Sequence, residues 1–220
     1  GFETMKKLFL KVSAWWYRQR PHKPSGQWLI DWLFKFRLAQ ALQASGSVVV
    51  AFSGDSRWHQ GENILQKQAG WRVFAVSGSK ADPDGLRYGA AISGLCKAQV
   101  TAIDWAGNDF LQNAKVKDVL KAHLDVRARI ALQGGIVLSY EICPLGLPAA
   151  NPVNVKIARF NALLAAAIGP DFVKLNHILA PGGTMLQKYD SGDHIHWTDA
   201  AFNDAVIPQT KAALRAMGVV

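Results

Sequence analysis

Only two of the 220 residues are cysteines, Cys96 and Cys143, and no Cys-x-x-Cys pair occurs. This scarcity excludes a disulfide framework and the common cysteine-based zinc sites. Two buried thiols are the favoured interpretation, with a single disulfide as the alternative. The sequence also lacks the Walker phosphate loop and the Rossmann glycine fingerprint, so neither signature of nucleotide binding is present. We expect no cofactor.

The sequence has no long apolar run. No stretch approaches the 18 or more apolar residues that a membrane-spanning helix needs. Residues 5–10 read Met-Lys-Lys-Leu-Phe-Leu and resemble the start of a signal peptide, but Lys11 ends the apolar run and no clear cleavage site follows. A cytoplasmic location is therefore expected.

Acidic residues are few, 16 against 25 lysines and arginines, and the formal net charge is +9. Residues 1–40 carry eight basic side chains against Glu3 and Asp31, a net +6, which leaves +3 for the rest of the chain. We expect a solvated basic helix face that covers part of the domain. Peripheral contact of residues 5–40 with a membrane or an anionic polymer is the alternative, and nucleic acid is not an expected partner.

Hydrophobic periodicity divides the chain near residue 46. Residues 1–45 predict a basic, Trp-rich helical extension packed on the domain, with helical spacing over 6–19 and 27–43. Residues 46–220 alternate short β-branched runs with helical stretches, which predicts one α/β domain with helices on both faces of a mostly parallel, five-stranded sheet. The expected strands are 47–53, 71–76, 99–104, 136–140 and 172–175, and the expected helices 58–69, 84–96, 113–132, 153–168 and 198–217.

Polar residues follow the first and third of these strands. Ser56 ends the segment Gly54-Asp55-Ser56, where a serine at the mouth of a helix has an exposed hydroxyl and a free backbone N–H. Asn108 lies in Gly-Asn-Asp after the third strand, and its amide can donate to an oxyanion. Each tripeptide alone is common in turns.

A carboxylate and an imidazole lie three residues apart near the C-terminus, as Asp193 and His196. The carboxylate can orient the imidazole, and the imidazole can take a proton from Ser56 as general base. With His194 between them, these residues are also conceivable metal ligands, but no fourth ligand is evident and no metal is expected.

Together these motifs resemble the conserved blocks of the SGNH, or GDSL-like, hydrolases. Gly54-Asp55-Ser56 resembles the first block, Val76-Ser77-Gly78 the second, Gly107-Asn108-Asp109 the third and Asp193-x-x-His196 the fifth, over about residues 47–217. The resemblance implies a three-layer α/β/α, flavodoxin-like fold. It also implies that Ser56 is the nucleophile, His196 the base and Asp193 its orienting partner. The oxyanion hole is then formed by Ser56 N–H, Gly78 N–H and the Asn108 side chain, while Asp55 braces the turn.

The sequence departs from this pattern beside the nucleophile, where Arg57 replaces the usual Leu or Ile, and after Gly78, where Ser79 follows. We expect Arg57, Trp58 and Trp197 to contact the substrate. A short-chain acyl or acetyl ester, on a small molecule or a carbohydrate, is the preferred substrate. A lipase or thioesterase for longer chains, or a binding module built on the basic N-terminus, is the alternative. The oligomeric state is not predicted.

A classical α/β-hydrolase elbow is excluded because Gly-x-Ser-x-Gly is required, and Trp58 stands at the second glycine position.

Overall fold

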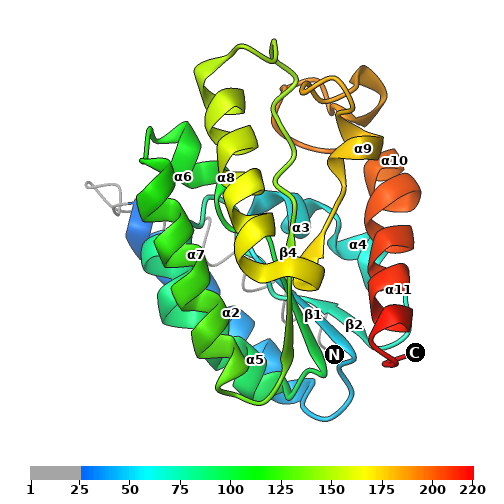
Figure 1. The fold of residues 1–220 in the computed structure, drawn as a ribbon. Helices are drawn as coiled ribbons and strands as arrows, with labels where there is room; N and C mark the ends of the chain where they lie inside the picture. The colour runs from blue at the N-terminus through cyan, green and yellow to red at the C-terminus, as the bar shows by residue number, and fades with distance from the viewer. Residues whose placement is uncertain (1–25) are drawn as a thin grey trace.

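A computed structural model describes residues 26–220 and contains one five-stranded sheet (Figure 1). All its neighbouring strands run parallel, in the order β2-β1-β3-β4-β5. The predicted parallel α/β architecture is therefore confirmed; β4 has the expected bounds, and the other four strands are two or three residues shorter than expected. The strands are β1 (Val50–Ser53), β2 (Trp71–Val73), β3 (Val100–Ile103), β4 (Ile136–Tyr140) and β5 (Phe172–Val173).

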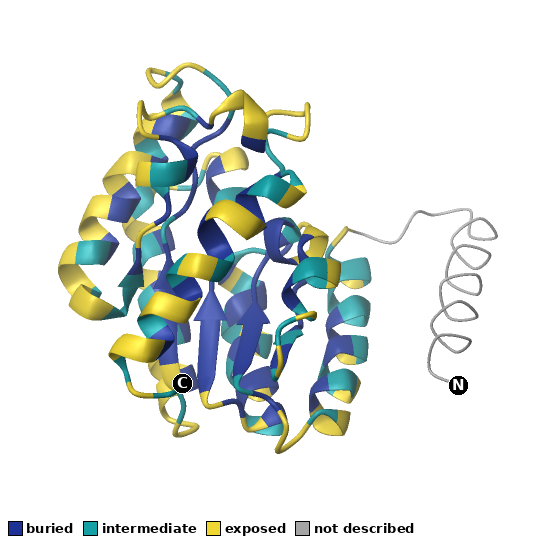
Figure 2. Ribbon diagram, turned by 90° about the vertical axis from the view of Figure 1, so that its right-hand side faces the viewer, coloured by how far each residue is buried: buried dark blue, intermediate teal, exposed yellow. Residues whose placement is uncertain are grey.

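Helices cover both faces of the sheet, and the strands between them are buried (Figure 2). The longer helices are α2 (Gly26–Gln43), α7 (Val116–Ala131), α8 (Pro152–Ile168) and α11 (Ile207–Ala216). The shorter α-helices are α3 (Ser56–Gln60), α4 (Glu62–Leu65), α5 (Ala90–Cys96), α6 (Gly107–Leu111), α9 (Asn176–Leu179) and α10 (Asp199–Ala201). Tighter or wider helical turns form η1 (Ala81–Gly89), η2 (Gly169–Asp171), η3 (Gln187–Tyr189) and η4 (Phe202–Val206).

Alternate residues of β1 enter two separate cores. Val50 and Phe52 of β1 pack on the side of α3, α10 and η4, whereas Ala51 packs with α2, α5 and α7. Strands buried on both faces read as continuous apolar runs, which is why residues 47–53 show no polar alternation. Cys143 and Cys96 lie in these two different cores, and both thiols are buried and free.

Arg37 anchors α2 to the domain. Its side chain is buried, donates to the carbonyls of Ala75 (3.1 Å) and Val73 (3.3 Å), and pairs with Glu62 at 2.7 Å. The expectation of a solvated basic face is therefore wrong at this residue, because its guanidinium satisfies carbonyls at the end of β2. The helix expected over 27–43 is present as α2, and the one expected over 6–19 lies outside the described residues.

Three predicted helices are divided, and the one expected over 84–96 consists of η1 and α5. The helix expected over 58–69 begins at Ser56 and divides at Gly61 into α3 and α4, while the last one divides into α10, η4 and α11 around Pro208. The short helices α6 and α9 were not predicted, because four or five residues carry too little periodicity to detect. Within the part of the chain that the structure describes, no helix has the length and apolar character to cross a bilayer.

Candidate active site

The candidate site lies where the chain order reverses within the sheet. β1 is flanked by β2 on one side and by β3 on the other, so the segments that follow these three strands leave from the same edge. Crevices at such switch points are the usual ligand sites of open parallel sheets. The segments after β1, β2 and β3 carry Ser56, Gly78 and Asn108 respectively.

A chain of hydrogen bonds links Ser56, His196 and Asp193. Ser56 Oγ lies 3.0 Å from His196 Nε2, and His196 Nδ1 lies 2.5 Å from Asp193 Oδ2. Asp193 Oδ1 also accepts the backbone N–H groups of Ile195 (2.9 Å) and His196 (2.8 Å). Partial burial raises the pKa of Asp193, but these N–H groups and the imidazole outweigh it and hold that pKa well below its usual range. The carboxylate is thus ionised and fixed against the ring.

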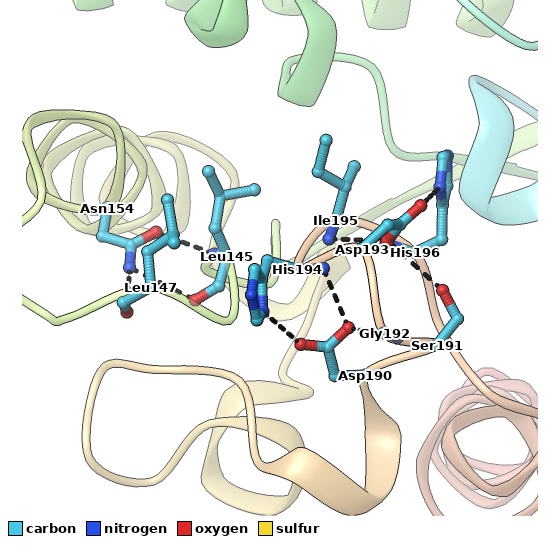
Figure 3. A network of polar contacts seen from close by, with 10 residues as sticks. All are labelled: Leu145, Leu147, Asn154, Asp190, Ser191, Gly192, Asp193, His194, Ile195 and His196. Carbon is cyan, nitrogen blue, oxygen red and sulfur yellow. Dashed lines mark hydrogen bonds and ion pairs between the residues drawn. The ribbon is translucent and has the colours of Figure 1, made fainter.

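A second carboxylate–imidazole pair shapes the same loop (Figure 3). Asp190 Oδ1 accepts the N–H groups of Gly192 (2.8 Å) and His194 (2.9 Å), and Asp190 Oδ2 lies 2.8 Å from His194 Nδ1. His194 has a positive φ of 64°, a conformation that few non-glycine residues adopt and that this pairing holds. Asp190 therefore folds the turn from which Asp193 and His196 project.

The two histidine rings have different partners, His194 with Asp190 and His196 with Asp193 (Figure 3). Within residues 26–220, no group of three or more His, Cys, Asp or Glu side chains is placed to hold a metal ion. The arrangement is that of two hydrogen-bonded pairs.

Gly78 presents its backbone from a tight turn. Ser79 N–H donates to Val76 O at 3.2 Å, and Gly78 occupies the third position of this turn with φ +82°. A type II turn requires a positive φ there, which explains the glycine. Neither Gly78 N–H nor Ser56 N–H donates to an acceptor within the described residues, so both are available to a ligand oxygen.

Ser79 connects the three loops. Its buried hydroxyl donates to Gly54 O at 3.0 Å and accepts from Trp105 Nε1 at 3.0 Å, while its carbonyl accepts from Asn108 Nδ2 at 2.9 Å. The Asn108 amide has two N–H groups, and this bond fixes one of them. The second N–H is the donor that the sequence analysis assigned to the oxyanion hole.

Three buried aspartates hold the backbone behind these loops. Asp104 Oδ1 accepts Asp55 N–H (3.2 Å), Asp55 Oδ1 accepts Arg57 N–H (3.0 Å), and Asp109 Oδ2 accepts Ala81 N–H (3.1 Å). Burial raises the pKa of Asp55, against the charge of Arg57. Burial and the neighbouring Asp55 raise the pKa of Asp104 well above its usual range, and burial raises that of Asp109 to about 6. Asp55 therefore braces the turn, as expected, and does so with Asp104.

Gly54 makes the close approach of Asp104 possible. A Cβ at position 54 would lie 1.8 Å from Asp104 Oδ1 and 2.6 Å from Trp58 Cδ1. No side chain fits there, so the glycine before Asp55 is required by packing.

Arg57, Trp58 and Trp197, which we expected to contact the substrate, are buried. Trp58 is 0% exposed and meets Trp197 edge-on in the core, where Trp197 is 5% exposed. Arg57 is also 5% exposed, and its guanidinium donates to Cys143 O (2.8 Å) and Ile195 O (3.2 Å). Arg57 and Trp58 lie on α3 and Trp197 lies in the loop before α10, and all three side chains are packed inside the protein. Arg57 instead ties α3 to the loop that carries His196.

Ser79, Asp104 and Asp190 were not predicted from the sequence as parts of this site. Ser79 was noted only as a departure from the second block. The position of Asp104, directly after the buried strand β3, was a usable signal, since a carboxylate there lies at the sheet edge beside buried residues.

No protein-family profile matches the chain, and no curated protein matches it in sequence. Solved structures do match. A GDSL-like lipase from Bacteroides thetaiotaomicron is 17% identical, with a TM-score of 0.68 over 83% of this chain and 98% of that one. The esterase EstA from a Pseudoalteromonas species is 12% identical, with a TM-score of 0.57 over 77% and 98%. A carbohydrate esterase family 3 structure from Talaromyces cellulolyticus is 13% identical, with a TM-score of 0.60 over 77% and 97%. The chain therefore has the fold of the GDSL-like lipases and esterases, which the four sequence blocks predict.

Proposed function

We propose that this protein is a serine ester hydrolase in which Ser56 is the nucleophile. The observation that carries the proposal is the continuous contact from Ser56 Oγ through the His196 ring to Asp193, at 3.0 and 2.5 Å. Such a chain is the arrangement that lets an imidazole remove the proton of a serine hydroxyl during attack. The fold shared with lipases and esterases supports the same reaction class.

In the first half of the reaction, Ser56 Oγ attacks the ester carbonyl carbon while His196 Nε2 takes the hydroxyl proton. The tetrahedral oxyanion is stabilised by Ser56 N–H, Gly78 N–H and the second N–H of Asn108. His196 then gives its proton to the departing alkoxide, which leaves as the alcohol. The acyl group remains on the enzyme as an ester of Ser56. In the second half, His196 activates a water that releases the acid and restores Ser56. Asp193 stays ionised throughout and stabilises the imidazolium.

The packing below Ser56 favours a small acyl group. Trp58 fills the core under α3, with Tyr140 and Phe52 edge-on at 4.9 and 5.2 Å ring separation. A long acyl chain therefore has no room to extend inwards beneath the nucleophile. An acetyl or short-chain acyl ester, on a small alcohol or a sugar, fits this geometry best.

Replacing the nucleophile tests the reaction class. Ser56→Ala should lower the hydrolysis of p-nitrophenyl acetate by roughly 10³-fold or more. Ser53→Ala is the matched control, because Ser53 lies three residues earlier and is fully buried, and its hydroxyl has no hydrogen-bond partner among residues 26–220. A fluorophosphonate probe should label the wild type on the peptide that contains Ser56. Full hydrolysis by Ser56→Ala contradicts the proposal.

A series of p-nitrophenyl esters from acetate to laurate tests the acyl group. We expect kcat/KM to be highest for the shortest acyl chains. A maximum at decanoate or longer contradicts the small acyl site while leaving the serine mechanism intact. Acetylated sugars and an acyl-CoA in the same series distinguish the alcohol and thiol parts of the substrate.

A further inference from the structure

The outward face of α8 is apolar, where a surface helix is normally polar. Val155 and Leu163 are 55% and 42% exposed. Helix α8 contains no acidic residue, and its only charged residues are Lys156 and Arg159. A helix on a protein surface usually buries one apolar stripe and presents charges of both signs to water. Contiguous exposed apolar surface of this kind marks a contact site. The exposed positions are Pro152, Val155, Ala158, Arg159, Ala162, Leu163, Ala166 and Ala167.

A groove of about 480 Å³ lies between α8 and the N-terminal part of α7, which run side by side on the same flank of the molecule (Figure 1). Its floor is aliphatic and its rim is basic, and none of the described residues that line it is acidic. The floor consists of Val116, Leu120, Val155 and Leu163, and the rim of Lys115, Lys117, Lys156 and Arg159.

The part of the chain that the structure describes does not neutralise the rim cations. Among residues 26–220, no carboxylate forms an ion pair with any of the four. Lys156 Nζ donates to the neutral amide of Asn113 at 2.6 Å. The acid nearest in sequence to the rim, Asp118, lines a separate cleft with Lys80 and Asp109. The groove therefore combines a concentrated positive charge with an aliphatic floor.

We propose that the α7–α8 groove docks this protein on an anionic lipid bilayer. Val155 and Leu163 enter the interface, and the four rim cations contact the lipid phosphates. Aliphatic side chains flanked by lysine and arginine are the combination that binds anionic membrane surfaces. The proposal does not depend on the hydrolase function, and it concerns a different surface from residues 5–40.

Charge argues against the two occupants that the chain itself could supply. A second copy would bring the same rim of four cations against the first. Residues 1–25 carry six basic side chains against Glu3 alone, so they have the same sign as the rim. An anionic bilayer complements both the rim and the floor.

Vesicle flotation with the full chain tests the proposal. We expect binding to vesicles of phosphatidylcholine with about 30 mol% phosphatidylglycerol, no binding to phosphatidylcholine alone, and weakening with salt. The double variant Lys117→Glu with Arg159→Glu should bind roughly tenfold more weakly. The matched control is Lys211→Glu with Arg215→Glu, which makes the same charge change at exposed positions of α11. Equal weakening by both double variants overturns the assignment to this groove.

A second pair of variants tests the aliphatic floor. Val155→Ser with Leu163→Ser should weaken vesicle binding several-fold while keeping its salt dependence, since the rim is unchanged. All variants keep residues 1–25, so any contribution of that segment is equal, and thermal melting checks that each is folded. Heparin serves as a soluble polyanion without an apolar phase. The bilayer is overturned as the partner if Val155→Ser with Leu163→Ser binds vesicles as strongly as the wild type does and heparin binds the protein as strongly as the vesicles do.

Discussion

The hydroxyl of Ser79 donates to the carbonyl of Gly54 at 3.0 Å, and this bond joins the turn of Gly78 to the turn that carries Ser56. Two of the proposed oxyanion donors are backbone N–H groups, whose directions depend entirely on how these turns are held. The Ser79 hydroxyl thereby holds together the two turns from which these N–H groups project.

Removing that hydroxyl should lower both the stability of the protein and its activity. Ser79→Ala leaves Gly54 O and Trp105 Nε1 without their partner, at a cost of about 1–3 kcal/mol in unfolding free energy. We expect kcat/KM for p-nitrophenyl acetate to fall roughly tenfold, mainly through kcat, as the oxyanion donors lose alignment. The adjacent, exposed Ser77→Ala is the control and should resemble the wild type. An unchanged kcat in Ser79→Ala contradicts this role.

Replacing the two aspartates of the C-terminal loop should affect kcat and Tm differently: Asp193→Asn mainly lowers kcat, and Asp190→Asn mainly lowers Tm. Asp193→Asn keeps most of the loop but loses the carboxylate against His196, so kcat should fall by roughly 10³–10⁴ with little change in Tm. Asp190→Asn weakens the bonds to Gly192 and His194 that fold the loop, so Tm should fall while a larger share of activity remains. Kinetics and thermal melting of both variants distinguish the roles. A reversed ranking in kcat would show that Asp190 belongs to the reacting groups.

Adding a methyl group at Gly54 should prevent correct folding of the site. The new Cβ would collide with Asp104 Oδ1 and the Trp58 ring, so we expect Gly54→Ala to lower the unfolding free energy by about 3 kcal/mol or more. Gly26→Ala is the matched control, because nothing lies within 4 Å of a Cβ at that helical position. Denaturant unfolding measures both, and equal midpoints contradict the packing argument.

Asp109 should make stability depend on pH in weak acid. Burial raises the pKa of its carboxyl to about 6, whereas an unfolded aspartate titrates near 3.9. The folded state therefore retains a proton that the unfolded state releases between these values. Its contribution to stability is present below about pH 4 and is lost as the pH rises through 6, by no more than about 3 kcal/mol.

Asp109→Asn removes this titration. The Tm of the variant relative to the wild type should therefore rise between pH 4 and pH 7, as measured by thermal melting across that range. Asp118→Asn, at an exposed position of the neighbouring α7, is the control and should show a constant difference. If the Tm difference between Asp109→Asn and the wild type is also constant from pH 4 to pH 7, the buried carboxyl does not titrate in this range.

The sheet was predictable because its strands are short, mainly apolar runs, and the segments between them show helical spacing over enough residues to recognise. The proposed site was predictable in part, since Ser56, Gly78, Asn108 and His196 lie at strand ends or in short motifs. The direction in which each side chain points was not predictable. Trp58 and Trp197 adjoin the site in sequence, yet α3 and the last loop turn both rings into the core. Bonds between distant loops, such as Ser79 to Gly54, leave no local pattern in the sequence.

Labelling of the two free cysteines can measure how the helices on each face of the sheet separate from the strands. Cys96 and Cys143 lie on opposite sides of the sheet, and burial raises the pKa of both thiols, that of Cys143 to about 11. A thiol reagent can therefore reach each cysteine only when its own helical layer separates from the strands. The labelling rates of the Cys96 and Cys143 peptides, measured in one sample, would give the rate at which each face of the sheet becomes exposed. No engineered probe is needed.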